Sequence, residues 1–216
     1  RSVHFHCDAV QGAGKVDIDV SALGVDTLAL SAHKLHAPKG IGALYVRRGL
    51  SLGRHILGGA QERRRRAGTE NVPLAVAFGV AAEIARDRVD VGALRDALES
   101  ALLVAGFPIV INGADVPRIP NTSSVTFRGA DAEGIVIGLD LSGVAVSTGA
   151  ACSSGRIEPS HVLLAMGLTP EEARATVRFS LSRFSTIDEI EQTVSLLREI
   201  VPRCVPAGGR DLDMPR

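Results

Sequence analysis

The sequence is short of cysteine, has no excess charge of either sign and contains no long apolar run. Its three cysteines, Cys7, Cys152 and Cys204, are odd in number and widely spaced. This pattern argues against a disulfide framework or a zinc ligand set and indicates a reducing, cytoplasmic setting. Lys plus Arg equals Asp plus Glu at 24 each, so no overall field attracts nucleic acid or an anionic membrane. No run approaches the roughly 20 apolar residues of a membrane helix. We therefore expect a protein that binds neither nucleic acid nor membrane.

The composition is that of a globular protein. Of the 216 residues, 45% are hydrophobic, which is enough to bury a real core in one large domain or two small ones. The chain opens with Arg1 and enters the strand-like stretch VHFHCDAV directly, without an apolar signal core. We therefore expect the sequence to begin inside a domain.

Strand and helix patterns divide the chain into two parts. Short apolar runs rich in β-forming residues predict strands, and apolar residues at helical spacing predict helices. Asn71 is a candidate helix cap. The predicted strands of the first part are 3–7, 27–32 and 41–46, followed by a helix at 71–88. The predicted elements of the second part are a helix at 91–106, strands at 109–111, 122–127 and 176–181, and helices at 131–141, 159–166 and 187–201.

This mixture of strands and helices predicts an α/β protein with a smaller α+β domain at its C-terminal end. We place the first domain at residues 1–88 and the second at residues 89–204, with two helices meeting near residues 87–90. Residues 205–216 carry Pro, Gly and charge without periodicity, and they predict a loose tail.

The stretch SAHKLHAPKG, residues 31–40, holds the first candidate for chemistry. Lys34 follows an apolar strand, where a lysine amine loses part of its hydration and becomes free to attack a carbonyl, as in a Schiff base. Taken alone, Lys34 and Lys39 fit the cap of a loop better than a catalytic role. The choice between these readings depends on their neighbours.

The neighbours favour Lys34 as a Schiff-base lysine. Ser31 and His33 offer hydrogen-bonding groups suited to a phosphate. Asp8 ends the first predicted strand, and a buried carboxylate there suits a protonated pyridine nitrogen, the charge that makes pyridoxal phosphate an electron sink. Gln11 follows three residues later and is placed to reach a ring hydroxyl.

The second candidate for chemistry is Cys152, in the stretch GAACSSGR. The small residues and glycines around it indicate an accessible loop, in which a thiol reacts and then moves. We interpret Cys152 as reactive. Cys7 lies in a predicted strand and Cys204 lies near the tail, so both are interpreted as structural.

Other polar residues have more than one possible role. Arg178, in the stretch VRFS, fits either a surface ion pair or a grip on a substrate carboxylate. By itself, the run Arg63–Arg66 fits a solvated or polyanion-binding surface. His4 and His6 alternate on a predicted strand, but no further ligands accompany them, so we expect no metal site.

Five segments extend these observations over nearly the whole chain. They are DAVQ, SAHKLHAPKGIGALYVR, GGAQERRRRAGTEN, STGAACSSGRIEPSHVLLAMG and VRFSLSRFST. In this order they resemble the cysteine desulfurases of the class-V aminotransferase group, in particular the subgroup that serves iron–sulfur cluster assembly. The resemblance implies a fold type I pyridoxal-phosphate-dependent transferase, with an incomplete large-domain sheet and a smaller C-terminal domain that carries the cysteine loop.

The resemblance implies how the cofactor is held. Lys34 bonds covalently to pyridoxal 5'-phosphate, Asp8 pairs with the pyridine nitrogen, and Gln11 contacts the ring oxygen. Ser31 and His33 bind the phosphate. Thr69, in the segment RAGTEN, corresponds to a threonine that reaches the phosphate of a second subunit, which implies a homodimer with a shared active site.

The resemblance also implies the reaction. Arg178 grips the carboxylate of L-cysteine, and Lys34 is the base that takes its α-proton. The thiolate of Cys152 then takes the sulfur as a persulfide, which leaves L-alanine, and the sulfur passes to an acceptor or scaffold protein. The resemblance also places Arg63–Arg66 near the mouth of the active site, which makes contact with the acceptor protein an alternative to a solvated surface. The alternative is a selenocysteine lyase or another class-V aminotransferase, which keeps Lys34 and Asp8 without using Cys152 in the same way.

One part of the family pattern has no counterpart here. Family members have a longer N-terminal half of the cofactor domain, with a histidine that stacks on the ring and an asparagine near the ring oxygen. We therefore expect an incomplete sheet within residues 1–90 and weak or no cofactor binding by the chain alone. An inactive fragment or a binding module is the second alternative.

Overall fold

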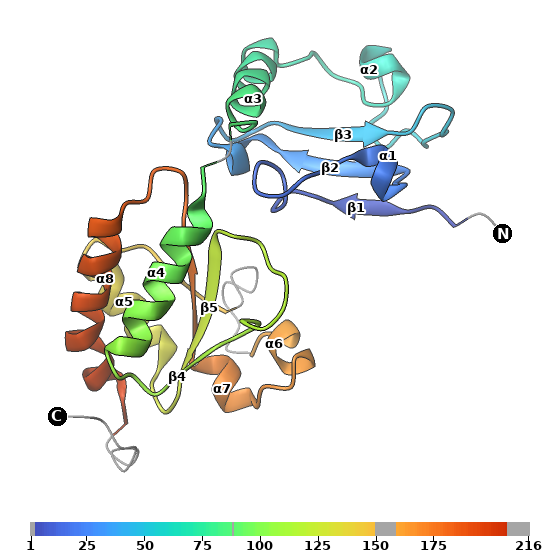
Figure 1. Ribbon diagram of the computed structural model, residues 1–216. Helices are drawn as coiled ribbons and strands as arrows, with labels where there is room; N and C mark the ends of the chain where they lie inside the picture. Colours follow the sequence, from blue (N-terminus) through green and yellow to red (C-terminus); the bar gives the residue numbers. More distant parts are fainter. Residues whose placement is uncertain (1–2, 88, 150–158, 207–216) are drawn as a thin grey trace. The chain divides into compact units, whose positions relative to one another are not determined.

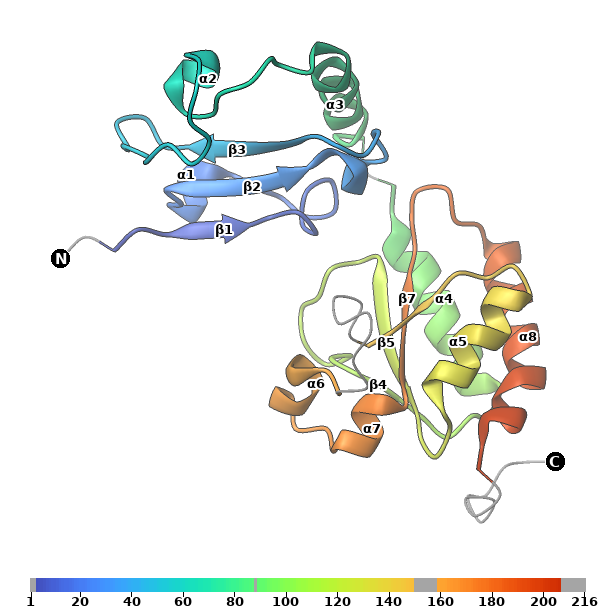
Figure 2. The same ribbon diagram turned by 180° about the vertical axis from the view of Figure 1, so that it is seen from behind.

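The computed structural model describes residues 3–87, 89–149 and 159–206. The chain divides into two compact units, residues 1–88 and residues 89–216. Figure 1 and Figure 2 show both units. Most of the expected tail, residues 207–216, lies outside the described residues, as does Cys152. In the described ranges no helix is long and apolar enough to cross a membrane.

The first unit is built on a three-stranded sheet with the order β1-β2-β3. β1 and β2 run parallel, and β3 runs antiparallel to β2. The carboxyl ends of β1 and β2 therefore meet at the same edge of the sheet. The strands are β1 (His6–Asp8), β2 (Thr27–Ser31) and β3 (Gly42–Val46).

Short helical segments connect and cover this sheet. Asn71 caps α3 as predicted, because its side chain accepts a hydrogen bond from the backbone N–H of Leu74 at 3.2 Å. Glu62 and Arg63 have left-handed φ angles of 48° and 55°, so their segment is a turn and not a regular α-helix. The segments are α1 (Val20–Leu23), the 3-10 helix η1 (Ala32–Leu35), α2 (Gln61–Arg64) and α3 (Val72–Ile84).

The first unit has a small core. Its central cluster of buried side chains is Ala9, Val25 and Leu28. In contrast, α3 exposes an apolar side chain at every fourth position, and a residue spacing of four places these side chains along one stripe of the helix. The stripe consists of Val72, Val76, Val80 and Ile84, which are between 51% and 61% exposed. The sheet is incomplete, and apolar surface of α3 is left uncovered by the described residues.

The second unit has a four-stranded antiparallel sheet with the order β4-β5-β7-β6. Figures 1 and 2 show α4, α5 and α8 on one face of this sheet and α6 and α7 on the other side. The strands are β4 (Ile109–Ile111), β5 (Thr122–Phe127), β6 (Ser147–Thr148) and β7 (Thr176–Ser180). The helices are α4 (Val91–Val104), α5 (Ala132–Leu141), α6 (His161–Ala165), α7 (Pro170–Arg174), α8 (Ile187–Ile200) and the 3-10 helix η2 (Val201–Cys204).

The core of the second unit lies between its sheet and the helices α4, α5 and α8. Phe127 is 1% exposed and packs edge-on against Phe107, with ring centroids 6.0 Å apart. Leu139 and Leu197 are fully buried in the same cluster. Complete burial of large apolar side chains is the main favourable contribution to stability, so this cluster stabilises the sheet of the second unit.

The predicted elements of both units are present, with differences at their ends. β4 and β5 have the predicted bounds, whereas β1 begins at His6 and not at residue 3. The elements missing from the prediction are short: α1, η1, α2, β6, α7 and η2. Two- to five-residue elements show little periodicity, and a strand such as β6 exists only because β7 pairs with it.

A buried ionic network connects α4 with β5 in the second unit. Arg118 donates two hydrogen bonds to Glu99, at 2.6 and 2.7 Å, and the hydroxyl of Ser123 donates a third at 2.6 Å. Burial alone would raise the pKa of Glu99. The hydrogen bonds from Arg118 and Ser123, with the positive charge of Arg118 and Arg95, outweigh burial and lower this pKa.

The lowered pKa of Glu99 makes the stability of the second unit depend on pH. A carboxylate whose pKa is lower in the folded state stabilises the fold above its unfolded pKa, about 4.3 for glutamate, and this stabilisation is lost as the pH falls through the folded value. We expect Glu99→Gln to be less stable than the unsubstituted chain at pH 7, and the difference in stability to shrink as the pH falls below about 4. Urea unfolding of both chains at several pH values measures this difference in stability. A constant difference over this range would contradict the assignment.

Candidate active site

The candidate active site lies where β1 and β2 end. Asp8 is the last residue of β1 and Ser31 the last residue of β2. The register pairs Asp8 with Ala29, two residues before Ser31. In α/β sheets, ligands bind outside the carboxyl ends of parallel strands. The structure therefore brings Asp8, Ser31 and the residues that follow them to one edge of the sheet.

Lys34 reaches this edge because the chain turns sharply after β2. Ser31 is extended, with φ −132° and ψ 127°, and the next residues form η1, which ends at His36 in a left-handed conformation. Ala32 is fully buried and anchors this turn. Lys34 is half-buried, and within the described residues no hydrogen bond or ion pair engages its amine. An amine without a partner is available for bonding to a carbonyl carbon.

Ser31 and His33 form a pair beside Lys34. The Oγ atom of Ser31 lies 2.9 Å from Nδ1 of His33. Because a hydroxyl and an imidazole can both donate hydrogen bonds, this pair is a donor set suited to phosphate oxygens. The sequence predicts each residue as a phosphate ligand but not the bond that orients them toward each other.

Gln11 lies in a tight loop after β1. The backbone N–H of Ala13 donates to the carbonyl of Ala9 at 3.0 Å, which folds the loop back on the end of the strand. Gly14 has a φ of +72°, and a Cβ atom there would lie 2.9 Å from Cδ2 of Leu35 and 3.2 Å from Cβ of Ala85. The glycine thus lets this loop pack closely against η1.

Lys15 is a member of this site that the sequence prediction missed. Its Nζ atom donates to the backbone oxygen of Gln11 at 3.0 Å and to Oε1 of Gln11 at 3.1 Å. Burial, and then the positive charge of Lys34, lower the pKa of Lys15. The available signal was compositional: only three of the 24 basic residues are lysines, namely Lys15, Lys34 and Lys39, and two of the three meet here.

Asp8 is exposed in the structure, although the sequence predicts that it is buried. The sequence predicts a buried carboxylate, but the side chain is exposed, because the strand it ends lies at the margin of the incomplete sheet. One carboxylate oxygen accepts a hydrogen bond from the backbone N–H of Val10 at 3.0 Å. This bond orients the carboxylate at the edge where Lys34 lies.

The arginine run begins in α2, which ends at Arg64, and continues with Arg65 and Arg66 into the loop before α3, which also carries Thr69. Thr69 is exposed, and within the described residues no hydrogen bond connects it to Lys34 or to the Ser31–His33 pair. Arg66 donates to the backbone oxygen of Ala67 at 2.9 Å. The structure therefore leaves the role of Thr69 as a prediction.

His4 and His6 do not contribute to a metal site in the described part of the chain. In that part no group of three or more histidine, cysteine, aspartate or glutamate side chains is placed to hold a metal ion. The Nδ1 atom of His6 lies 2.8 Å from Oγ1 of Thr27 on the neighbouring strand. His6 is thus used in pairing β1 with β2.

In the second unit, Arg178 occupies the middle of β7. It lies opposite Ser124 of β5 and Ser147 of β6. Its Nε atom is buried and has no hydrogen-bond partner among the described residues, and none of the described ion pairs includes it. The alternative of a surface ion pair is therefore not supported. A buried donor without a partner is costly, so the Nε atom of Arg178 retains an unused capacity to donate a hydrogen bond.

The segment that leads toward Cys152 begins beside Arg178. β6 pairs Ser147 with Arg178, and the backbone N–H of Gly149 donates to the carbonyl of Thr176 at 3.0 Å. A Cβ atom at Gly149 would lie 2.8 Å from Cδ1 of Leu163, so the chain passes close to α6 there. Cys152 itself follows outside the described residues.

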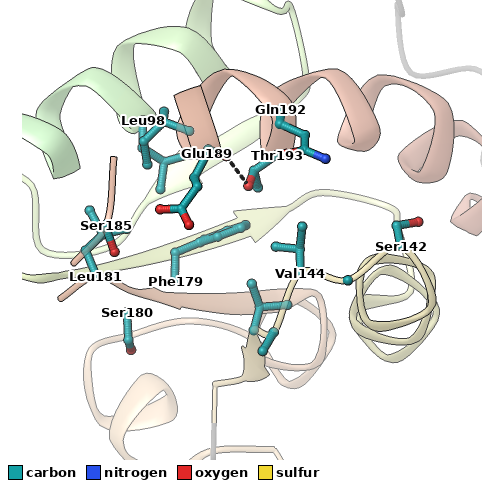
Figure 3. Close-up of a pocket in the computed structure, with 14 residues that line it drawn as sticks. Leu98, Ser142, Val144, Phe179, Ser180, Leu181, Ser185, Glu189, Gln192 and Thr193 are labelled. Carbon is teal, nitrogen blue, oxygen red and sulfur yellow. Dashed lines mark hydrogen bonds between the residues drawn. The ribbon is translucent and has the colours of Figure 1, made fainter. Parts of the chain in front are cut away.

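A pocket of about 270 Å³ lies elsewhere in the second unit. Figure 3 shows α8 side chains, including Glu189 and Thr193, above Phe179 of β7. Successive strand residues point to opposite faces, so this pocket lies on the opposite face from the Arg178 side chain. The carboxylate of Glu189 already accepts a hydrogen bond from the backbone N–H of Thr186 at 2.8 Å. The lining holds none of the predicted site residues, and we do not assign chemistry to this pocket.

Comparison with known proteins identifies the class. Residues 1–193 match the family of class-V aminotransferases, and the chain belongs to this family, whose members depend on pyridoxal phosphate. The α/β fold with partial sheets is that of the fold type I enzymes of this family.

The most informative relatives are cysteine desulfurases. The chain is 48% identical over 203 residues to cysteine desulfurase 2 of Trichormus variabilis, covering 92% of the chain and 51% of that protein. A solved structure of a NifS-like protein from Rickettsia africae matches with a TM-score of 0.82 at 35% identity. The match covers 91% of this chain and 53% of the NifS-like chain. The solved structure of SspA in complex with cysteine matches with a TM-score of 0.68 at 36% identity. This match covers 85% of the present chain and 52% of the SspA chain. The chain spans about half the length of the relatives it matches.

The donor set of the first unit fits pyridoxal phosphate. The set consists of the amine of Lys34, the carboxylate of Asp8, the amide of Gln11 and the hydroxyl–imidazole pair of Ser31 and His33. All of these residues lie at or just after the ends of two paired strands. These are the groups needed for the carbonyl, the ring nitrogen, the ring oxygen and the phosphate of this cofactor.

We expect Gly14→Ala to weaken the site through its loop. The added methyl group meets Leu35 and Ala85 at a positive φ, whereas Gly24→Ala has a similar φ of +65° and nothing within 4 Å. The Gly24 variant therefore serves as the matched control for backbone strain. Overpacking typically costs about 1–3 kcal/mol, so urea unfolding should show Gly14→Ala less stable than Gly24→Ala by roughly this amount. Equal stabilities would mean that the loop does not pack on η1.

Proposed function

We propose that the protein acts as a cysteine desulfurase, which converts L-cysteine to L-alanine and takes up the sulfur as a persulfide on Cys152. The observation that carries the proposal is the half-buried Lys34 amine, which has no partner among the described residues and lies beside the Ser31–His33 donor pair. The similarity to cysteine desulfurases at 48% identity supports it.

Residues of the first unit would hold the cofactor. Lys34 would bond to its carbonyl carbon, Asp8 would pair with the ring nitrogen, Gln11 would donate to the ring oxygen, and Ser31 with His33 would bind the phosphate. Pyridoxal phosphate supplies an electron sink that stabilises a carbanion at the α-carbon of an amino acid. Once displaced by substrate, the Lys34 amine is free to take the α-proton, because the described residues leave it without a competing hydrogen bond.

Residues of the second unit would handle the substrate. Arg178 would bind the carboxylate of L-cysteine, since its buried Nε lacks a partner among the described residues and a guanidinium fork fits a carboxylate. The neighbour described as SspA in complex with cysteine supports cysteine as the substrate. The thiolate of Cys152 would attack the substrate sulfur. A sulfur–sulfur bond forms as the carbon–sulfur bond breaks, and the electron pair stays with carbon, which is protonated to alanine.

The proposal extends to partners and location. A homodimer would place Thr69 at the phosphate of the second subunit, and the exposure of Thr69 is compatible with this. A sulfur acceptor or iron–sulfur scaffold protein would then receive the persulfide. A cytoplasmic location is supported by Cys7 and Cys204, which are both free thiols.

The test is production of alanine from L-cysteine. Because the chain spans about half the length of its relatives, it is assayed alone and as a chimera in which it replaces the matched half of the Trichormus variabilis relative. With pyridoxal phosphate added, we expect the chimera to be active and the chain alone to be weakly active or inactive. Lys34→Ala should lower the rate by at least about a hundredfold, as expected for loss of a general base. Lys39→Ala, an exposed lysine, is the matched control.

The role of Cys152 is tested separately. Cys152→Ala should abolish turnover of L-cysteine, because no thiolate would take the sulfur, while Cys7→Ala should retain it. Retained turnover of L-cysteine with faster turnover of selenocysteine would instead identify a selenocysteine lyase. An inactive chimera that still binds the cofactor through Lys34 would contradict the enzymatic proposal.

A further inference from the structure

We infer that Lys15 is a positioning residue of the cofactor site, which sets the direction of the Gln11 amide. The inference rests on the proposed function of the site, because it concerns the group that Gln11 would contact. Lys15 lies four residues after Gln11 in the loop that follows β1, and neither the sequence prediction nor the resemblance assigns it a role.

The hydrogen bonds determine the amide orientation. An amide side chain has one oxygen that accepts and one nitrogen that donates, and the two are nearly isosteric. A lysine ammonium only donates. The atom of Gln11 that faces Nζ of Lys15 at 3.1 Å must therefore be the oxygen, and the second bond to the backbone oxygen of Gln11 at 3.0 Å fixes the lysine in place.

The consequence is that the N–H donor of the Gln11 side chain is held in one direction. With Oε1 occupied by Lys15, the Nε2 group of Gln11 is left with no hydrogen-bond partner among the described residues. The ring oxygen of pyridoxal phosphate is an acceptor, so it needs this donor and not the amide oxygen. Without Lys15, the amide could rotate by half a turn and present its oxygen, which would repel the ring oxygen.

The environment of Lys15 places it at the site and not on the open surface. Its side chain is half-buried, and its pKa is lowered by burial and by the charge of Lys34. The close packing of Gly14 against Leu35 brings this loop against η1, the segment that carries Lys34. Lys15 thus binds the Gln11 amide and is close enough to the Lys34 amine for the two charges to interact.

The first experiment measures the lysine network in the chain without cofactor. Nuclear magnetic resonance of the chain labelled with nitrogen-15 on lysine gives three side-chain signals, assigned by Lys15→Met, Lys34→Met and Lys39→Met. We expect the Lys15 signal to titrate at lower pH than that of Lys39, to shift on Gln11→Ala, and to titrate higher on Lys34→Met. A Lys15 signal that titrates like that of Lys39 and responds to neither substitution would overturn the inference.

The second experiment measures the effect on the cofactor. Pyridoxal phosphate is titrated into the chain and the chimera, and its absorbance when bound to lysine is followed against pH. We expect Lys15→Met to weaken binding about tenfold, the size of one charged hydrogen bond. We also expect it to raise the pH midpoint of the absorbance change, because the Gln11 amide would no longer be held with its donor toward the ring oxygen. Lys15→Arg, which can donate both bonds, should restore much of the affinity, and Lys39→Met should bind normally.

A double substitution separates positioning from a direct role. If Lys15 acts through Gln11, Lys15→Met in the Gln11→Ala background should cause no further loss of affinity. Additive losses would overturn the positioning role. Failure of the unsubstituted chimera to bind the cofactor would remove the proposed function, whereas the lysine signals of the first experiment would still decide whether Lys15 holds Gln11.

Discussion

The parallel pairing of β1 with β2 is the constraint on which the candidate site depends. It places Asp8 and Ser31 at the same edge of the sheet, with Asp8 opposite Ala29. Side chains alternate between faces along a strand, so a shift of one residue in β1 or β2 would turn Asp8 or Ser31 to the other face of the sheet. The register is held by Leu28, which is buried in the small core, and by the contact of His6 with Thr27.

From that edge, two turns carry the other residues of the candidate site. The loop after β1 holds Gln11 and Lys15, and η1 after β2 holds His33 and Lys34. Each turn contains a residue with a positive φ, Gly14 in the first and His36 in the second. Tight turns of this kind bring side chains from separate strand ends together without a long loop to order, which lowers the entropy lost on forming the site.

The two units differ in how they hold their functional residues. The first unit has a small core and an uncovered apolar stripe along α3, so its site residues are held mainly by local turns and hydrogen bonds. In the second unit, Arg178 lies in a strand backed by fully buried side chains such as Val177 and Leu197. A charged side chain on such a rigid support is well suited to fix the orientation of a small substrate.

The strand and helix positions followed from local patterns in the sequence, because alternation, helical spacing and caps such as Asn71 act within a few residues. The prediction that Lys34 is the Schiff-base lysine followed from the order of its neighbouring motifs. Other features depended on contacts that sequence spacing does not encode. The exposure of Asp8 reflects its place at the margin of the sheet, and the network of Glu99 with Arg118 joins residues 19 positions apart. The bond between Lys15 and Gln11 spans only four residues, yet it forms because the loop folds back on β1, which only the tertiary structure decided.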